Sequence, residues 1–261
     1  MPNFDVSTHI DQIRILAYRN SLNCTLLGLV RDFPLLLLTP KLIDPNLPNL
    51  LIATGFHGDE PAGCLAIKEI LENELGEFAE LTQFANLSFL PIVNPTGIEA
   101  GIRTNYLGQD PNRGFYALPG FPNSPSIEGE ILLKNQTKLK YLAKDGFLSL
   151  HEDVDLSDTF YLYTFESLRA PGPFSYAMQL VAARHFSPPS DGIWEGARVK
   201  NGIIYRHSDT SLEDYLFKCG IPLTASAEVP AQNSLDKHVA LCTSYIKAFA
   251  EYFQTQPSVL M

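Results

Sequence analysis

The sequence lacks the features of a membrane-spanning or disordered chain. No apolar run approaches the roughly 18 residues that a transmembrane helix needs. Only 18% of the 261 residues are charged and 45% are hydrophobic, so the chain can bury a full core. The N-terminal stretch carries acidic and amide side chains where a signal peptide would have a basic and then an apolar segment. We therefore expect a cytoplasmic, globular protein.

Basic residues are scarce. Lys and Arg number 19 against 29 Asp and Glu, which gives a formal net charge of −10. A chain of this sign repels phosphate backbones and anionic membrane surfaces. The balance therefore argues against both nucleic acid and membranes as partners, and it carries no information on oligomeric state.

Cysteine is also scarce, and several catalytic motifs are missing. The four cysteines form no CxxC pair, which argues against a local thiolate zinc knuckle or a dithiol redox site. Cys64, among small apolar residues, is expected in the core rather than as a ligand. The sequence contains no G-x-S-x-G elbow, no glycine-rich dinucleotide fingerprint, no P-loop and no internal repeat. These absences disfavour serine hydrolases, dinucleotide-dependent enzymes, P-loop nucleotide hydrolases and solenoids.

What the chain does have is an alternation of short apolar runs with longer segments of helical spacing, which is typical of a layered α/β domain. The expected strands are 24–29, 35–39, 49–54, 87–93, 146–150, 160–164 and 223–227. The expected helices are 61–75, 127–142, 172–185, 211–218 and 236–253. We predict a single domain over 1–261, and the short segment before the first expected strand leads us to expect no propeptide.

A segment of some thirty residues, 94–126, separates an expected strand from an expected helix and is dense in Gly, Pro and Asn. Structureless connections of this length inside a compact domain are usually functional. A domain boundary is the other explanation, but no second self-contained core follows. We therefore interpret 94–126 as an active-site loop.

Polar residues follow several of the buried strands directly. His57 and Glu60 follow one strand, and Asn94, His151 and Glu228 each follow another. Ligands of open α/β sheets bind at the carboxyl ends of the strands, so these side chains should converge on one edge.

His57 and Glu60 lie three residues apart across an expected strand-to-helix turn, where Gly58 would let the backbone turn tightly. Together with a distant histidine they would satisfy zinc and leave a fourth position for water. Of the other histidines only His151 ends an expected strand. A hydrogen-bonded core histidine remains the alternative for each taken alone.

The order of motifs resembles the zinc carboxypeptidase family over about residues 49–230. The matching segments are HGDE at 57–60, Arg103, DPNR at 110–113, LSLHE at 148–152, Tyr205 ahead of SLEDY, and AEVP at 227–230. The resemblance implies a three-layer α/β/α sandwich on a mixed, mostly parallel sheet. It also implies one Zn²⁺ per chain, held by His57, Glu60 and His151.

The resemblance further implies a role for each polar residue around the metal. Glu228 would act as general base toward a zinc-bound water, and Arg103 would polarise the scissile carbonyl. Asn112 and Arg113 would hold the terminal carboxylate of the substrate, because a guanidinium forks onto a carboxylate with two hydrogen bonds. Tyr205 would close over the substrate, although Tyr215 competes for that role.

The function implied is a metallocarboxypeptidase that hydrolyses the C-terminal amide bond of short peptides. Succinylglutamate desuccinylase and aspartoacylase share much of the frame, so a deacylase of N-acyl amino acids is an alternative, and a non-catalytic binding protein is another. A deacylase would need a further arginine for its second carboxylate, which Arg198 or Arg206 could supply. The partner in either reaction is a small substrate with a free carboxylate.

Three residues depart from the pattern of the digestive members. Asp59 stands where arginine is common, Glu152 follows the third ligand where serine is common, and Pro111 replaces the usual aliphatic residue. Asp59, Glu152 and the following Asp153 are acidic. If they line the mouth, they would favour substrates with an ammonium group; otherwise Asp59 supports a ligand and the other two are solvated. A second metal near Asp153 or Asp155 is a further alternative.

Overall fold

The protein is described by a computed structural model over residues 4–73, 76–194 and 196–254. Its backbone is organised around one ten-stranded sheet with the strand order β1-β2-β4-β3-β5-β10-β6-β9-β8-β7. The strands are β1 (Leu22–Val30), β2 (Phe33–Pro40), β3 (Asn49–Thr54), β4 (Asn86–Leu90), β5 (Gly146–Asp153), β6 (Tyr161–Glu166), β7 (Gly192–Trp194), β8 (Ala197–Lys200), β9 (Ile203–Tyr205) and β10 (Leu223–Pro230).

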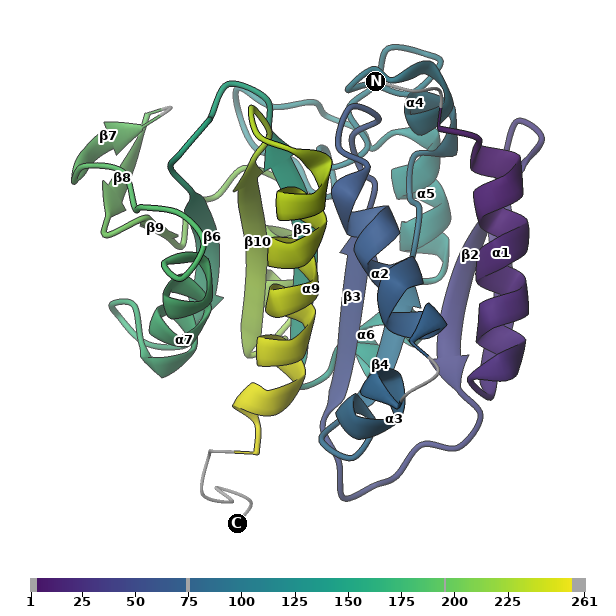
Figure 1. The fold of residues 1–261 in the computed structure, drawn as a ribbon. Coiled ribbons are helices and arrows are strands. Elements are labelled where there is room, and N and C mark those ends of the chain that lie inside the picture. Colours follow the sequence, from purple (N-terminus) through teal and green to yellow (C-terminus); the bar gives the residue numbers. More distant parts are fainter. Residues whose placement is uncertain (1–3, 74–75, 195, 255–261) are drawn as a thin grey trace.

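Helices cover both faces of this sheet, which makes the three-layer α/β/α arrangement expected from the sequence (Figure 1). One face carries α1 (Val6–Arg19), α2 (Ala62–Glu72), α3 (Glu77–Leu81), α7 (Pro173–Ala182) and α9 (Leu235–Tyr252). The other carries α5 (Ile127–Lys134), α6 (Gln136–Leu142) and α8 (Leu212–Lys218). The short helix α4 (Pro95–Ala100) lies beyond the end of β4.

The strand β3 shows why the sequence folds into three layers. All six of its residues are buried, because both of its faces are covered. Leu50 and Ile52 belong to the core beneath α2 and α9, whereas Leu51 and Ala53 belong to the core beneath α5 and α6. The two-residue period of a strand distributes a continuous apolar run over both faces, as in buried parallel sheets.

Parallel pairing is concentrated in the centre of the sheet. The strands β4, β3, β5 and β10 are mutually parallel, and β6 also pairs with β9 in parallel. The pairs at the β1 edge and among β7, β8 and β9 are antiparallel, as is the pair of β10 with β6. The mixed sheet is confirmed. Its parallel centre carries His151 and Glu228, and the turn after β3 carries His57 and Glu60.

Several elements differ from those expected. The helix expected over 127–142 is two helices that meet at Asn135, whose side chain donates to the carbonyl oxygen of Ile131. The segment expected before the first strand contains α1, and the loop at 94–126 contains α4. The strands β7 to β9 were not expected, because each has only three or four residues. The expected helix end at Leu75 lies outside the described residues.

No helix among the described residues has both the length and the apolar character needed to cross a membrane.

A buried histidine links the stability of the fold to pH. His9 on α1 is 4% exposed, its ring lies 4.9 Å from that of Phe4, and its Nε2 has no hydrogen-bond partner among the described residues. Burial, together with the charge of Lys68, lowers the pKa of His9 to about 4. Between pH 4 and about 6.5 the unfolded chain therefore binds a proton that the folded chain does not.

We predict that wild-type stability falls as the pH drops through this window and that His9→Leu removes the His9 share of the loss. Lowering the pH from 8 to 5 should reduce the free energy of unfolding of wild type by about 2 kcal/mol more than that of the variant. Urea unfolding of both proteins at the two pH values measures this difference. A difference that does not change with pH would contradict the assignment to His9.

Candidate metal centre

The candidate site forms where the central strands end. The turn after β3 carries His57 and Glu60, β5 carries His151, and β10 carries Glu228. In the parallel pairing of β5 and β10, Glu228 lies directly beside His151. The convergence expected at this edge is therefore present, and a cavity of about 270 Å³ opens among these side chains.

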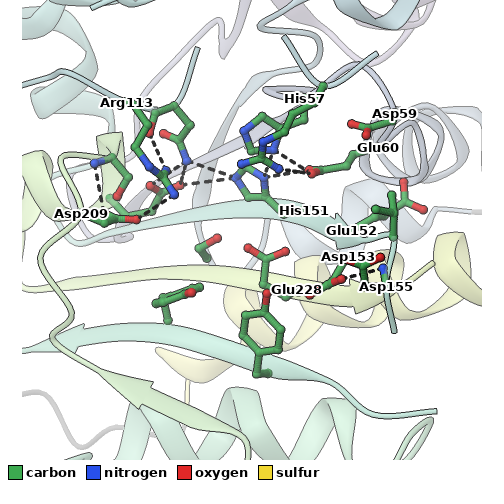
Figure 2. Close-up of a pocket in the computed structure, with 18 of the residues that line it drawn as sticks. His57, Asp59, Glu60, Arg113, His151, Glu152, Asp153, Asp155, Asp209 and Glu228 are labelled. Atoms are coloured by element: carbon green, nitrogen blue, oxygen red, sulfur yellow. Dashed lines mark hydrogen bonds and ion pairs between the residues drawn. The ribbon is translucent and has the colours of Figure 1, made fainter. Parts of the chain in front are cut away.

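His57, Glu60 and His151 offer three buried ligand atoms to one point (Figure 2). Nδ1 of His57 lies 2.7 Å from one carboxylate oxygen of Glu60, and Nδ1 of His151 lies 2.9 Å from the other. One ligand atom from each residue lies within 4.8 Å of the others. Two imidazole nitrogens and a carboxylate are a donor set that zinc accepts, so the residues fit a metal ion. Among the described residues this is the one such group, so the second metal considered near Asp153 or Asp155 has no support.

The three candidate ligands shift one another's pKa values toward the charged forms. The two imidazoles hold the pKa of Glu60 far below its usual range despite complete burial. Burial acts against the charged forms of His57 and His151, but the Glu60 carboxylate raises the pKa of both. The three groups therefore stabilise one another's charged forms, and a bound cation would take the place of the imidazole protons.

Each candidate histidine ligand has a carboxylate near its Nε2 atom. The sequence analysis identified neither carboxylate. Nε2 of His57 lies 3.2 Å from Asp110, and Nε2 of His151 lies 3.8 Å from Glu213. Contact with His151 lowers the pKa of Glu213 to about 2, although burial opposes the shift. Such partners fix the orientation and tautomer of a metal-binding histidine. Both lie inside segments already singled out, DPNR and SLEDY, so their motifs were the available signal.

Gly58 has a different role from the tight turn expected for it. Its backbone N–H donates to the carbonyl oxygen of Ile102 at 3.0 Å, and a Cβ at this position would lie 1.9 Å from the backbone carbon of Gly97. The turn that carries His57 thus packs directly on the loop that carries Arg103. Only glycine allows that approach.

Glu228 lines the cavity, and Figure 2 shows no hydrogen bond or ion pair between its carboxylate and the other residues drawn. Burial is the largest cause that raises its pKa to about 7; the His151 charge opposes the shift and the Glu60 charge adds to it. A carboxyl group with a pKa near neutrality can both take and return a proton.

Two arginines line the cavity. Arg103 is half-exposed and lies 3.5 Å from Glu60 and 3.3 Å from Asp110. Arg113 is paired with Asp209 at 3.4 Å and donates to the carbonyl oxygen of its neighbour Asn112 at 2.8 Å. In Figure 2, Arg113 and Asp209 lie on one side of the two histidines, and Asp59, Glu152, Asp153 and Asp155 lie on the other.

Asn112 also lies in the cavity, but its amide is engaged by α8. Its Oδ1 accepts from the backbone N–H of Leu212 at 3.0 Å, and its Nδ2 donates to Glu213 at 3.2 Å. The same Nδ2 lies 3.3 Å from Nε2 of His151. Asn112 therefore ties the DPNR segment to the start of α8 beside the metal centre.

The structure does not bring Tyr205 into the cavity. Its hydroxyl donates to the carbonyl oxygens of Leu168 at 2.8 Å and Glu166 at 3.1 Å. Tyr215, the competing candidate, donates to Gln136 on α6 and does not line the cavity. The tyrosines that line the cavity are Tyr161 and Tyr163, both on β6.

Sequence reasoning missed Tyr161 and Tyr163 because nothing local shows that β6 lies beside β10. Tyr161 pairs with Glu228 in the antiparallel register, and its hydroxyl donates to Asp153 at 2.8 Å. Burial and the nearby charge of Glu228 raise its pKa far above the usual range, so the hydroxyl stays protonated.

Asn94, the remaining strand-end residue, acts structurally. Its Oδ1 accepts from the backbone N–H of Gly97 and caps α4, and its Nδ2 donates to the carbonyl oxygen of Phe56 at 3.1 Å. It holds the metal-binding turn against the 94–126 segment, and it does not line the cavity.

The three acidic residues expected at the mouth, Asp59, Glu152 and Asp153, all line the cavity, but their surroundings differ. Asp59 is half-buried. Glu152 is only 4% exposed and is bonded to Ala62 and His238, so it is neither solvated nor free to meet a substrate.

Comparison with known proteins gives close structural relatives. A protein described as a "putative metallopeptidase" from Shewanella amazonensis is 36% identical, with a TM-score of 0.88, over 95% of this chain and 93% of its own. One described in the same words from Shewanella denitrificans is 35% identical, with a TM-score of 0.85, over 95% and 90%.

More distant structures share the fold. A metallo-carboxypeptidase from Pseudomonas aeruginosa, in complex with (2-guanidinoethylmercapto)succinic acid, is 18% identical, with a TM-score of 0.66, over 94% of this chain and 68% of its own. No protein-family model and no curated protein matches the chain.

Proposed function

The chain belongs to the zinc carboxypeptidase-like family of hydrolases, and on that premise we propose that it is a zinc-dependent metallocarboxypeptidase acting on short peptides in the cytoplasm. One observation carries the proposal. A three-residue metal site, an unengaged carboxyl group with a pKa near 7 and an arginine clamp line the same cavity.

His57, Glu60 and His151 would hold the zinc ion. A bound zinc ion polarises a carbonyl group and acidifies water, which is the chemistry that amide hydrolysis needs. Asp110 and Glu213 would keep the two imidazoles oriented, with Nδ1 of each toward the Glu60 carboxylate. The buried surroundings strengthen every charge interaction in the cavity.

Glu228 is the general base in this proposal. Its carboxylate takes a proton from the attacking water and passes that proton to the nitrogen of the leaving residue as the amide bond breaks. A pKa of about 7 allows both steps near neutral pH. Its place beside His151 in the β5–β10 register, in the lining of the same cavity, supports this role.

The arginines divide the remaining work. Arg103 lies against Glu60, so its guanidinium is close enough to the metal centre to stabilise the negative charge that develops on the carbonyl oxygen. Arg113 would bind the terminal carboxylate of the substrate, with Asn112 holding the segment in place. The Pseudomonas aeruginosa metallo-carboxypeptidase is in complex with (2-guanidinoethylmercapto)succinic acid, and this ligand supports the proposal that the substrate carries a carboxylate.

A deacylase of succinylglutamate desuccinylase or aspartoacylase type is less well supported. Its substrate carries a second carboxylate, and among the described residues the only arginines that line the cavity are Arg103 and Arg113. Arg206 is exposed and lies over the ring of Phe217, and Arg198 is exposed on β8. Neither arginine that could have supplied the extra charge reaches the cavity.

The cavity walls also favour a positive charge at the amino-terminal end of the substrate. Asp59, Asp153 and Asp155 lie on the side away from Arg113 (Figure 2). A short peptide that binds Arg113 through its carboxylate would direct its free amino terminus toward these acids. We therefore expect a preference for short peptides with an unblocked α-ammonium group.

Replacing the proposed base gives the most direct test of the reaction. Glu228→Gln removes the group that carries the proton but leaves the three candidate ligands in place. We expect zinc content to stay unchanged and kcat to fall by about 10²- to 10⁴-fold. Elemental analysis and a peptide hydrolysis assay measure the two effects. A variant that retained more than a few per cent of the wild-type rate would contradict the assigned role. That rate corresponds to an increase of only about 2 kcal/mol in the activation free energy.

A panel of short peptides of one sequence and different end groups tests the substrate class. Amidation of the C-terminus should abolish hydrolysis, because Arg113 then has no carboxylate to bind. Acetylation of the N-terminus should lower kcat/KM about fivefold, the effect of losing one solvent-screened charge pair. Equal rates for the free and acetylated peptides would contradict the preference for an ammonium group. Faster hydrolysis of N-acyl amino acids than of any peptide would favour the deacylase.

A further inference from the structure

Glu152 sits between the two segments that carry the candidate metal ligands. It follows His151 directly on β5 and is only 4% exposed (Figure 2). Its position next to a ligand in the sequence means that any displacement of its backbone also moves His151. What Glu152 contacts therefore bears on the geometry of the metal centre.

Both carboxylate oxygens of Glu152 are engaged by buried groups on different helices. Oε2 accepts a hydrogen bond from the backbone N–H of Ala62 at 2.6 Å, and Oε1 lies 2.9 Å from Nδ1 of His238 on α9. His238 is also only 4% exposed, and its Nε2 has no hydrogen-bond partner among the described residues. Its interaction with Glu152 is therefore the one polar contact that orients the ring.

The bond to Ala62 caps the helix that follows the metal-binding turn. Ala62 is the first residue of α2, and the N-cap position is Pro61, which has no side-chain hydrogen bond to offer. The first N–H groups of a helix lack partners within the helix, and the N-terminal end of its dipole favours a negative charge. Glu152 supplies both the acceptor and the charge from a neighbouring strand.

This cap couples the two ligand segments. Ala62 lies two residues after Glu60, and Glu152 lies one residue after His151. The hydrogen bond between Glu152 and Ala62 therefore connects the segment that carries Glu60 to the segment that carries His151. The contact with His238 on α9 holds the other oxygen of the same carboxylate in place. We infer that Glu152 and His238 form a positioning pair that sets the geometry of Glu60 and His151 and thereby the affinity for zinc. The inference rests on the metal centre of the proposed function. Glu152 lines the cavity, but Ala62 and His238 engage both of its carboxylate oxygens, so the pair acts through the ligands that it positions.

Direct measurement of zinc affinity tests the pair. Apo wild type, Glu152→Ala, Glu152→Gln and His238→Leu are titrated with zinc against a competing chelator. We expect Glu152→Ala to bind zinc about 10- to 100-fold more weakly, the usual effect of losing a partner that orients metal ligands. Glu152→Gln should lose less, because its amide oxygen can still accept from Ala62. His238→Leu should weaken binding in the same direction.

The chain offers a matched control in Glu166. This buried glutamate also caps a helix from a neighbouring strand, because its Oε1 accepts from the backbone N–H groups of Gly172 and Ser175 at 2.9 Å each. It lies at the end of β6, caps α7 and does not line the cavity. Glu166→Gln should lower the thermal unfolding temperature as Glu152→Gln does, but leave zinc affinity unchanged.

The outcomes separate this inference from the proposed function. If the Glu152 variants lose stability as the Glu166 variant does but bind zinc as tightly as wild type, Glu152 is only a structural cap and the inference is wrong. A KM that changes for peptides of one charge alone would make Glu152 a substrate-binding residue and also overturn it. Both results would leave the proposed function standing. A wild-type protein that takes up no zinc would overturn the proposed function and this inference together.

Discussion

The structure depends on one constraint: a carboxylate and two imidazoles from segments about ninety residues apart must meet at a single buried point. Glu60 and His151 are separated by 91 positions in the chain, yet Nδ1 of His151 lies 2.9 Å from the Glu60 carboxylate. The parallel centre of the sheet provides this meeting. Because β3, β5 and β10 run side by side in one direction, their carboxyl ends reach the same edge with the ligand turn, His151 and Glu228.

Bringing these groups together is costly unless each charge has a partner. Around the centre the partners are arranged in pairs: Asp110 behind His57, Glu213 near His151, and Asp209 beside Arg113. Asp59 and Glu228 differ from these pairs. Oδ1 of Asp59 has no hydrogen-bond partner among the described residues, and burial raises the pKa of both carboxyl groups, that of Glu228 to about 7. Glu228 is the one that the proposed reaction uses as a base.

The sequence was sufficient to predict the layers of the fold and the residues that meet at the candidate metal centre, because both leave local patterns. Continuous apolar runs such as 49–54 mark buried strands, and a histidine or glutamate directly after such a run marks the edge where ligands bind. Local patterns do not reveal which strands become neighbours in space. Tyr161 lies in the cavity because β6 pairs with β10, and Glu152 is buried because α2 and α9 pack against β5. For the same reason Tyr205, in a matching motif, lies against the carbonyl of Leu168 instead of in the cavity.

The central claim is that His57, Glu60 and His151 hold a catalytic zinc ion, and the metal content of the purified protein tests it most directly. Elemental analysis of wild type and of His151→Ala should find close to one zinc per wild-type chain and almost none in the variant. If wild type contained no metal and took up none when zinc was added, or if the variant kept its zinc, the account of this site would be contradicted.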